Sequence, residues 1–402
     1  MVTIPELQID LTNPSPGVVK TGEVYRLPKP VMASQLNWQP VNGGYAARLQ
    51  FVSDQAKRMC FHLAFKTKPS AIRFRVQGNS SNSAVFFADQ NFINDNNIWL
   101  PITVGTTGDL EIFIQGDQPE EGSFEVDAVN IIVAGIRSGN NRKIMEKQSL
   151  NDLIKPKSLG LALEPEFDLA CWNGVPEYPA LQVAANATAL ISFIRNGGSF
   201  ICTGTLLNDQ RNSSKPWFIT ANHCVTDQRA SNTLSFEWFF QAPACLSSDT
   251  DSRYSQTFGG ARLLYANKKN DTSFMRLRAR PPAGVAYSGW STKRLFVGRQ
   301  VWGVHHPEGD HTMVSQGAVT GLNQTVKGNN DTNLAVNEIL FSVGGAEIAS
   351  SGSGLFTVVN GLPYWVGGLY GGPVNDYQLN YYSRFRDVFP KIQPWLGKRR
   401  KS

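Results

Sequence analysis

The chain has 402 residues, 41% of them hydrophobic and 17% charged, which is enough for two or three globular domains with sizeable cores. Its net charge is +6, but much of the surplus lies in one connecting segment and in the terminal KRRKS, and no basic face with interleaved aromatic residues accompanies it, so nucleic acid is not an expected partner. No apolar run approaches the length of a membrane span, and MVTIPELQID lacks the basic and apolar regions of a signal peptide.

The first region, residues 1–136, contains short runs in which apolar and polar residues alternate. These runs are residues 46–52, 71–77, 84–88, 110–116 and 124–135, with turn residues between them. Alternation with a period of two is typical of half-buried strands, and many glycines and prolines favour turns over long helices. The pattern predicts a β-sandwich in a mainly β protein. A carbohydrate-binding or adhesion module would have a similar strand pattern.

A polar, basic segment follows at residues 137–165, and its composition is typical of an exposed linker. From residue 166 to 402 the strand-and-turn pattern returns. Near the end, Phe385, Val388, Phe389 and Ile392 have helical spacing, interrupted by two prolines, which predicts a short docked helix.

The segment WFITANHCV ends a predicted buried strand at a turn just before His223. A histidine at this place can be a satisfied core residue or a general base, which needs a proton donor within reach and a third group that fixes its tautomer. The neighbouring Cys224 is one of four cysteines in the second region, the others being Cys171, Cys202 and Cys245. Without C-x-x-C metal spacing these predict disulfides, in any of three pairings, and an oxidising compartment. A Cys202–Cys224 bond would anchor His223; Cys60 is then an apolar core residue.

An acid and a nucleophile are found downstream of His223. Asp271 lies after a polar loop and just before an alternating strand. Ser350, Ser351 and Ser353 lie among glycines in ASSGSGLF, where backbone N–H groups can converge on one point, as an oxyanion hole requires.

Together, CTGTLLND…PWFITANHCV, NDTSFMRL, GVHHPEGD and ASSGSGLF…VGGLYGGP resemble the chymotrypsin-like serine endopeptidases, most closely the bacterial lysyl endopeptidase branch. The resemblance covers about residues 170–397 and implies a double β-barrel with a short C-terminal helix. It also favours the pairings Cys202–Cys224 and Cys171–Cys245. The N-terminal region is similar to the propeptide sandwich of bacterial relatives, which implies an intramolecular inhibitor.

The resemblance implies that His223 is the base, Asp271 its orienting carboxylate and Ser351 the nucleophile, with an oxyanion hole formed by the N–H groups of Ala349 and Ser351. Ser353 as nucleophile would match the motif less well. Relatives have glycine where Ala349 stands, so a weakened oxyanion hole is an open alternative. Ser350 replaces the aspartate that pairs with a new N-terminus in animal enzymes, so that activation switch is not expected.

The same comparison of motifs places Tyr370, Gly371, Asp376 and Asn380 at the substrate pocket. Asn380 stands where lysine-specific relatives have an aspartate, and without that carboxylate a lysine ammonium would lose its countercharge. An aromatic or neutral preference is therefore as compatible with the sequence as a basic one, although Asp376 could substitute from the neighbouring loop.

The cluster HHPEGDH, with His305, His306, Asp310 and His311, is interpreted as structural, because adjacent histidines on a strand face opposite ways. His62 is interpreted as a packing residue. We expect no metal and no cofactor.

Two functions are compatible with the sequence. The first is a secreted or periplasmic serine endopeptidase that acts on protein or peptide substrates and is made with an inhibitory N-terminal domain. The second is a catalytically weakened protease-fold protein used for binding or adhesion.

Overall fold

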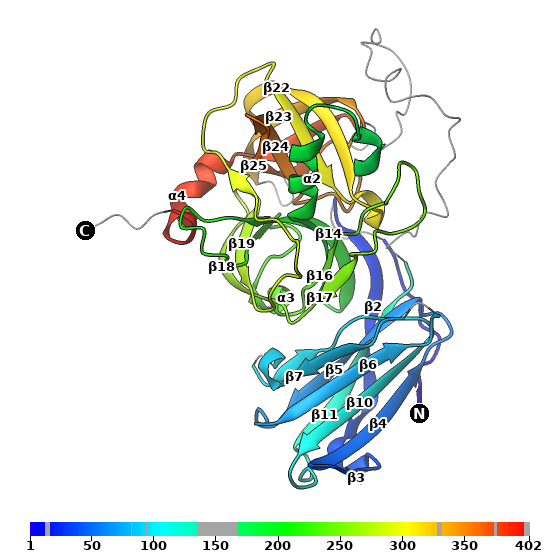
Figure 1. The fold of residues 1–402 in the computed structure, drawn as a ribbon. Helices are drawn as coiled ribbons and strands as arrows, with labels where there is room; N and C mark the ends of the chain where they lie inside the picture. Colours follow the sequence, from blue (N-terminus) through cyan, green and yellow to red (C-terminus); the bar gives the residue numbers. More distant parts are fainter. Residues whose placement is uncertain are drawn as a thin grey trace, which may run out of the picture.

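The computed structural model describes residues 1–12, 17–81, 83–93, 95–134, 167–327, 332–373 and 376–397. Figure 1 shows a β-sandwich in blue and cyan, two barrel-like units in green to orange, and a short helix in red near the C-terminus. The expected mainly β class, with a sandwich, two barrels and a terminal helix, is confirmed. The predicted linker at 137–165 and both of its boundaries lie outside the described residues, so the domain limits stay predictions.

The sandwich consists of two sheets packed face to face. One sheet holds β1 (Val2–Thr3), β3 (Gln39–Val41), β4 (Gly44–Val52), β6 (Ile72–Gly78), β7 (Phe86–Asp89) and β10 (Thr107–Gln115). The other holds β2 (Val19–Met32), β5 (Arg58–Phe65), β8 (Asn97–Trp99), β9 (Thr103–Val104) and β11 (Phe124–Ile132). Two 3₁₀ turns, Ala33–Gln35 and Gln90–Phe92, connect strands.

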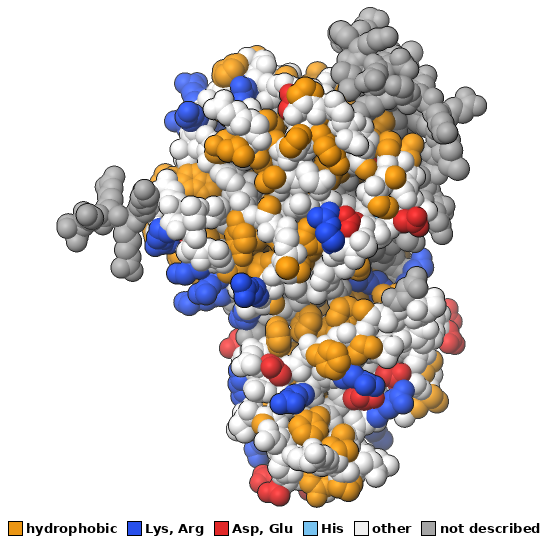
Figure 2. All heavy atoms as spheres, viewed as in Figure 1, with side chains coloured by type: hydrophobic (Ala, Val, Ile, Leu, Met, Phe, Trp, Pro, Cys, Tyr) orange, Lys and Arg blue, Asp and Glu red, His pale blue; other side chains and the backbone are white. Residues whose placement is uncertain are grey.

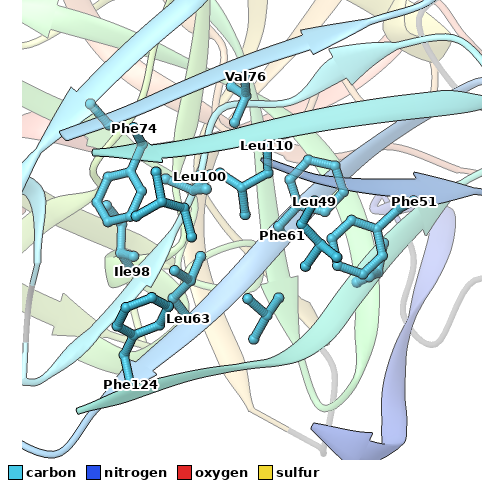
Figure 3. Close-up of a cluster of buried hydrophobic side chains, with 14 of the residues drawn as sticks. Leu49, Phe51, Phe61, Leu63, Phe74, Val76, Ile98, Leu100, Leu110 and Phe124 are labelled. Carbon is cyan, nitrogen blue, oxygen red and sulfur yellow. The ribbon is translucent and has the colours of Figure 1, made fainter. Parts of the chain in front are cut away.

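Alternate residues of these strands form the sandwich core. Figure 3 shows Leu49, Phe61, Phe74 and Leu110 converging from four different strands, and each is at most 6% exposed. The alternate positions of the same strands are polar; on the face shown in Figure 2, basic and acidic side chains are interspersed over the sandwich. The alternation in the sequence therefore gives the first sheet one buried and one solvated face, whereas the outer face of the second sheet is itself buried at Arg58, Cys60 and Asn130.

Strand β2 belongs to both halves of the molecule. It pairs antiparallel with β11 of the sandwich and, near its start, with β14 (Gly198–Leu207) of the first barrel. Figure 1 shows it as the blue strand that extends from the sandwich to β14. The two halves thus share one continuous sheet.

The first barrel begins at residue 188, in the second half of the chain, and includes β14. Its other strands are β13 (Thr188–Arg195), β15 (Trp217–Thr220), β16 (Ser235–Trp238), β17 (Ser255–Thr257), β18 (Ala261–Asn267) and β19 (Thr272–Leu277). Every residue of β14 is buried, since the strand lies between β13, β15 and β2. Helices α2 (Tyr178–Asn186) and α3 (Gln228–Asn232) flank it, and a 3₁₀ turn at Leu169–Trp172 precedes α2.

The second barrel is an eight-stranded sheet. Its strands are β12 (Phe167–Asp168), β20 (Gly289–Trp290), β21 (Gln300–His305), β22 (Met313–Lys327), β23 (Asn333–Val343), β24 (Gly354–Val359), β25 (Leu362–Gly371) and β26 (Leu379–Ser383). A 3₁₀ turn, Pro307–Gly309, follows β21.

The C-terminal helix α4 runs from Phe385 to Leu396 without a break, although the sequence predicted an interruption at its prolines. Proline removes a hydrogen-bond donor and disfavours the helix interior. Burial compensates for this loss: Phe385, Val388 and Ile392 are at most 1% exposed and pack in one cluster with residues of both barrels. No helix among the described ranges is long and apolar enough to cross a membrane.

Candidate active site

His223 and Asp271 meet at the end of two neighbouring strands. His223 follows β15 by three residues, and Asp271 directly precedes β19, which pairs with β15. One oxygen of the Asp271 carboxylate lies 2.8 Å from His223 Nδ1, and the other accepts the backbone N–H of His223, also at 2.8 Å. The ring N–H is therefore at Nδ1, which leaves Nε2 with a lone pair for a proton. Nε2 is buried and has no hydrogen-bond partner among the residues that the structure describes.

Several contacts hold the His223 segment in place. A disulfide joins Cys224 to Cys202 on β14. Arg195 donates to the carbonyl oxygens of His223 and Cys224 at 2.5 and 3.3 Å. Burial lowers the pKa of Arg195, but a guanidinium remains charged at neutral pH. The histidine ring thus lies on a backbone held by a covalent bond and by a half-buried cation.

Ser351 lies in a tight turn before β24. Ala349 has φ of 70° and Gly352 has φ of 82°, so left-handed residues stand on both sides of Ser350 and Ser351. A Cβ at Gly352 would lie 2.3 Å from Thr220 Oγ1 and 2.6 Å from a backbone nitrogen, so glycine is required there. The carbonyl oxygen of Ser351 accepts the N–H of Thr203 at 2.9 Å. The turn is thereby fixed against β14.

The buried His305 binds the same turn through the hydroxyl of Ser350. Its Nε2 lies 3.0 Å from Ser315 Oγ, which itself donates to the carbonyl oxygen of Gly345 at 2.6 Å. Ser315 must therefore accept from His305 Nε2, and Nδ1 accepts from the Ser350 hydroxyl at 2.9 Å. Burial, with a smaller effect from His306, lowers the pKa of His305 to about 3. Neutral His305 thus supports the residue beside Ser351.

Gly17, which lies two residues before β2, occupies the space in front of Ser351. Its carbonyl oxygen accepts the N–H of Ala349 at 3.1 Å. A Cβ on Gly17 would lie 2.3 Å from Ser351 Oγ and 3.2 Å from His223 Nε2. The hydroxyl and the imidazole therefore converge on one backbone position of the chain's own N-terminal segment.

Of the four predicted pocket residues, Tyr370 and Gly371 lie at the end of β25 beside His223, whereas Asp376 and Asn380 form hydrogen bonds with their own neighbours. Tyr370, at the end of β25, contacts the His223 ring edge to face with 5.9 Å between centroids, and Gly371 follows it. Asn380 is 1% exposed, and its amide donates to the carbonyl oxygen of Tyr377 at 2.7 Å. Asp376 is exposed and accepts the N–H groups of Gln378 and Leu379 in a turn. The carboxylate of Asp376 is thus used locally.

The cysteines and the other histidines form contacts that hold the fold together. The disulfides join Cys171 to Cys245 and Cys202 to Cys224, as expected, and Cys60 is free and buried. No group of three or more potential metal ligands occurs in the parts of the chain that the structure describes. His306 donates to the carbonyl oxygen of Asp310, and His311 contacts Thr250. His62 packs against Trp99 with the two rings tilted, but its Nδ1 also pairs with Asp127, so it is more than a packing residue.

Sequence reasoning missed Gly17 and an ion pair between the two halves. Arg58 on β5 lies 2.6 Å from Glu237 on β16, and the two side chains are 10% and 0% exposed. Both contacts join residues far apart in the chain, and no local pattern marks them. A glycine next to a strand is too common to signal its place in a distant site.

Two family models match the chain. The model described as lysyl endopeptidase, C-terminal domain, matches residues 159–385, and the lysyl endopeptidase N-terminal domain matches residues 23–131. A lysyl endopeptidase from Pseudomonas aeruginosa is 31% identical over 310 residues, which are 74% of this chain and 63% of that protein. This chain thus spans less than two thirds of that relative. A secreted RxLR effector protein 73 from Plasmopara viticola is 23% identical over 333 residues, 80% of this chain and 75% of that one.

Solved structures are more distant. The Rv3671c protease from M. tuberculosis, active form, is 15% identical with a TM-score of 0.41, covering 62% of this chain and 96% of that chain. The HtrA-type protease AlgW with tripeptide is 13% identical with a TM-score of 0.41, covering 56% and 64%. These low scores add nothing to the family matches.

Proposed function

Because this chain belongs to the lysyl endopeptidase family, we propose that it is a secreted serine endopeptidase that hydrolyses peptide bonds through an acyl-enzyme on Ser351. The observation that carries the proposal is the convergence of Ser351 Oγ and His223 Nε2 on one backbone position, with Asp271 on the far side of the imidazole. Two disulfides agree with an extracellular or periplasmic location.

In this mechanism His223 takes the proton of Ser351 as the hydroxyl attacks a carbonyl carbon, and returns it to the leaving amine. Asp271 keeps the Nδ1 proton on the ring and stabilises the imidazolium that forms. A water molecule then repeats the sequence on the ester. The backbone N–H groups of Ala349 and Ser351 would receive the oxyanion, and the Ala349 N–H already has a carbonyl oxygen as partner.

We expect the enzyme to prefer a neutral or aromatic residue over lysine on the acyl side of the cut. Asn380 offers an amide where a lysine ammonium would need a carboxylate, and Asp376 is exposed and engaged in its own turn. An unpaired buried ammonium is strongly disfavoured. Comparing peptide esters that differ only in this residue measures the preference; faster turnover of the lysine ester would contradict it.

The N-terminal domain is proposed to inhibit the protease. The residues in front of Ser351 belong to the segment that leads into β2, and not to the other strands of the sandwich. Pairing of β2 with β14 and the Arg58–Glu237 ion pair support the same role. Substrate and N-terminal segment would compete for one place.

Two serine variants test the assignment. After the N-terminal domain has been removed by cleavage at the linker, Ser351→Ala should lose peptidase activity, esterase activity and labelling by a fluorophosphonate, because only an activated serine reacts at speed. Ser353→Ala is the matched control and should label normally. Labelling of the first variant with loss in the second would show that Ser353 is the nucleophile. Failure of the unmutated fragment to label would favour the binding or adhesion function.

A further inference from the structure

The residues after Gly17 continue along the catalytic cleft in a regular register. Val18 is fully buried in the same hydrophobic cluster as Cys202 and Cys224, directly beside the His223 segment. Val19 then pairs antiparallel with Ile201 on β14, and Lys20 pairs with Phe200. From Val19 onward the backbone is therefore extended along β14, the usual way in which a protein surface binds a peptide strand.

The bond that this register brings to Ser351 is the one between Gly17 and Val18. The Gly17 carbonyl oxygen already accepts the Ala349 N–H at 3.1 Å, so the carbonyl group points into the proposed oxyanion hole. The Ser351 hydroxyl lies close to Gly17, and Nε2 of His223 is near the same point and has no hydrogen-bond partner in the described part of the chain. A nucleophile, a base and an oxyanion donor thus surround one carbonyl group.

Glycine is the residue type that this arrangement allows. Gly17 has φ of 83°, a left-handed conformation, and any side chain would point at the Ser351 hydroxyl. Residue 17 can lie this close to Ser351 only because glycine has no Cβ.

We propose that the chain cuts its own peptide bond between Gly17 and Val18, in cis, an inference that rests on the proposed function. Ser351 Oγ bonds to the Gly17 carbonyl carbon while its proton passes to His223 Nε2. The carbon–nitrogen bond breaks, and His223 gives the proton to the Val18 nitrogen. Water then hydrolyses the ester, which leaves a carboxylate at Gly17, an amino group at Val18 and free Ser351.

The cut would loosen the segment without releasing it at once. It places a new carboxylate and a new ammonium where Val18 is now fully buried, and burial of charge without a partner is costly. The peptide before the cut stays attached, because β1 pairs with β4 and Ile4 donates to the carbonyl oxygen of Val52 at 2.8 Å. Native purification would therefore hide the cut, and a denaturing measurement is needed.

The experiment follows the full-length chain over time by mass spectrometry in denaturant. The expected result is one species that ends at Gly17 and one that begins at Val18, formed at a rate that dilution does not change. The Ser351→Ala chain should remain intact at this bond. A rate that falls on dilution would overturn cleavage in cis, and a cut in Ser351→Ala would assign it to another protease.

A second pair of variants separates this inference from the proposed function. Gly17→Val should abolish the cut, since its side chain collides with Ser351, and should speed fluorophosphonate labelling of the full chain by displacing the segment. Gly43→Val is the matched control, because Gly43 also has φ of 83° but has no atom within 4 Å of the added Cβ; it should cut normally.

If the unmutated chain stays intact while Gly17→Val labels rapidly, the segment is an uncut inhibitor and the cleavage proposal is wrong, although the protease assignment stands. If no variant cuts or labels, even after separation of the N-terminal domain, the protease assignment itself fails.

Discussion

Ala349 adopts a left-handed conformation, which glycine adopts more readily than alanine, and its N–H still reaches a carbonyl oxygen. The alanine therefore affects stability more than the position of the donor. A left-handed L-residue costs roughly 1–2 kcal/mol, of which glycine's greater freedom in the unfolded chain offsets about 0.4–1 kcal/mol.

We predict that Ala349→Gly raises the free energy of unfolding by at most about 1.6 kcal/mol and leaves kcat/KM within about twofold. Urea unfolding of the Ser351→Ala background and ester kinetics of the active fragment measure the two effects. A gain in kcat of about tenfold or more would instead mean that alanine had impaired the oxyanion hole.

His305 and His306 give the fold a sensitivity to mild acid. Burial lowers the pKa of His305 to about 3 and that of His306 to about 4, from an ordinary 6.5. Below pH 6.5 the unfolded chain therefore binds more protons than the folded chain, so stability is full above pH 6.5 and declines as the pH falls towards the folded values.

We expect the free energy of unfolding of the Ser351→Ala chain to fall between pH 6.5 and 5 by up to about 1.4 kcal/mol per pH unit for each histidine. Most carboxyl groups titrate below this range. His305→Asn should reduce the change of the free energy of unfolding per pH unit. His62→Asn, on the sandwich, is the control and should leave the contribution of His305 and His306 to that change unaltered. An unchanged slope in His305→Asn would refute this origin.

At the scale of elements, β2 depends on a glycine where it pairs with both neighbours. Gly22 lies opposite Ile132 of β11 and Ser199 of β14, and a Cβ there would lie 2.0 Å from the carbonyl oxygen of Ile131. A side chain would thus collide with β11 and displace β2 at the residue that also pairs with β14.

Gly22→Val should speed fluorophosphonate labelling of the full chain, because separation of β2 from β14 removes Gly17 from Ser351. Gly78→Val serves as the control: its Cβ would lie 1.9 Å from the carbonyl oxygen of Val104, in a sandwich strand that does not touch β14. Equal labelling of both variants would indicate general unfolding of the sandwich instead of a role for β2.

Strand β2 also shows where prediction from sequence ends. Alternation identified β4, β6, β10 and β11, because one face of each is buried. The sequence VKTGEVYRLPKPVM has one glycine and two prolines, which argue against a strand. In the structure Pro28 and Pro30 lie between two paired stretches of β2, where the ladder with β11 shifts register, so neither blocks a ladder bond.

The same limit applies to the candidate site. His223, Asp271 and Ser351 stand in motifs whose local spacing carries information, and the structure brings them to one place. Gly17 arrives through pairing between strands that are distant in sequence, and the helix α4 survives two prolines because of its buried face. These outcomes depend on tertiary packing, which one sequence does not display.

At the scale of the whole molecule, the buried Arg58–Glu237 pair connects the two halves. Burial would raise the pKa of Glu237, but the adjacent guanidinium lowers it below its usual range, so the pair is charged at neutral pH. Glu237 also accepts from Tyr254 and from Gln256, the latter at 3.1 Å. Loss of Arg58 would leave a buried carboxylate without a countercharge.

After cleavage at the linker, Arg58→Met should weaken association of the two fragments by about 3–5 kcal/mol, or about two to four orders of magnitude in Kd. The double variant Arg58→Met/Glu237→Met should recover much of this loss, because a packed apolar pair replaces the ions. Titration of one fragment with the other gives both constants. Equal weakening in single and double variants would exclude the uncompensated charge as the cause.

Control by the N-terminal domain is tested with the same fragments. The chain cut within NNRKIMEKQSLNDLIKPK should hydrolyse a small peptide ester slowly while the fragments stay together and rapidly once they are separated, since loss of the tether lowers the effective concentration of the inhibitor. If the intact chain is already as fast as the isolated fragment that starts near residue 158, the N-terminal domain is an accessory module.

The edge of β14 that binds β2 also constrains how such a protein can evolve. It contacts its own N-terminal strand through backbone groups at Gly198–Ile201, and backbones of foreign peptides present the same groups. A mutation that weakens binding of β2 to this edge would weaken binding of substrate as well. Natural substitutions that alter inhibition by the N-terminal domain should therefore accumulate at the linker and around Arg58 and Glu237, where they do not affect substrate binding. The β14 edge should stay unchanged.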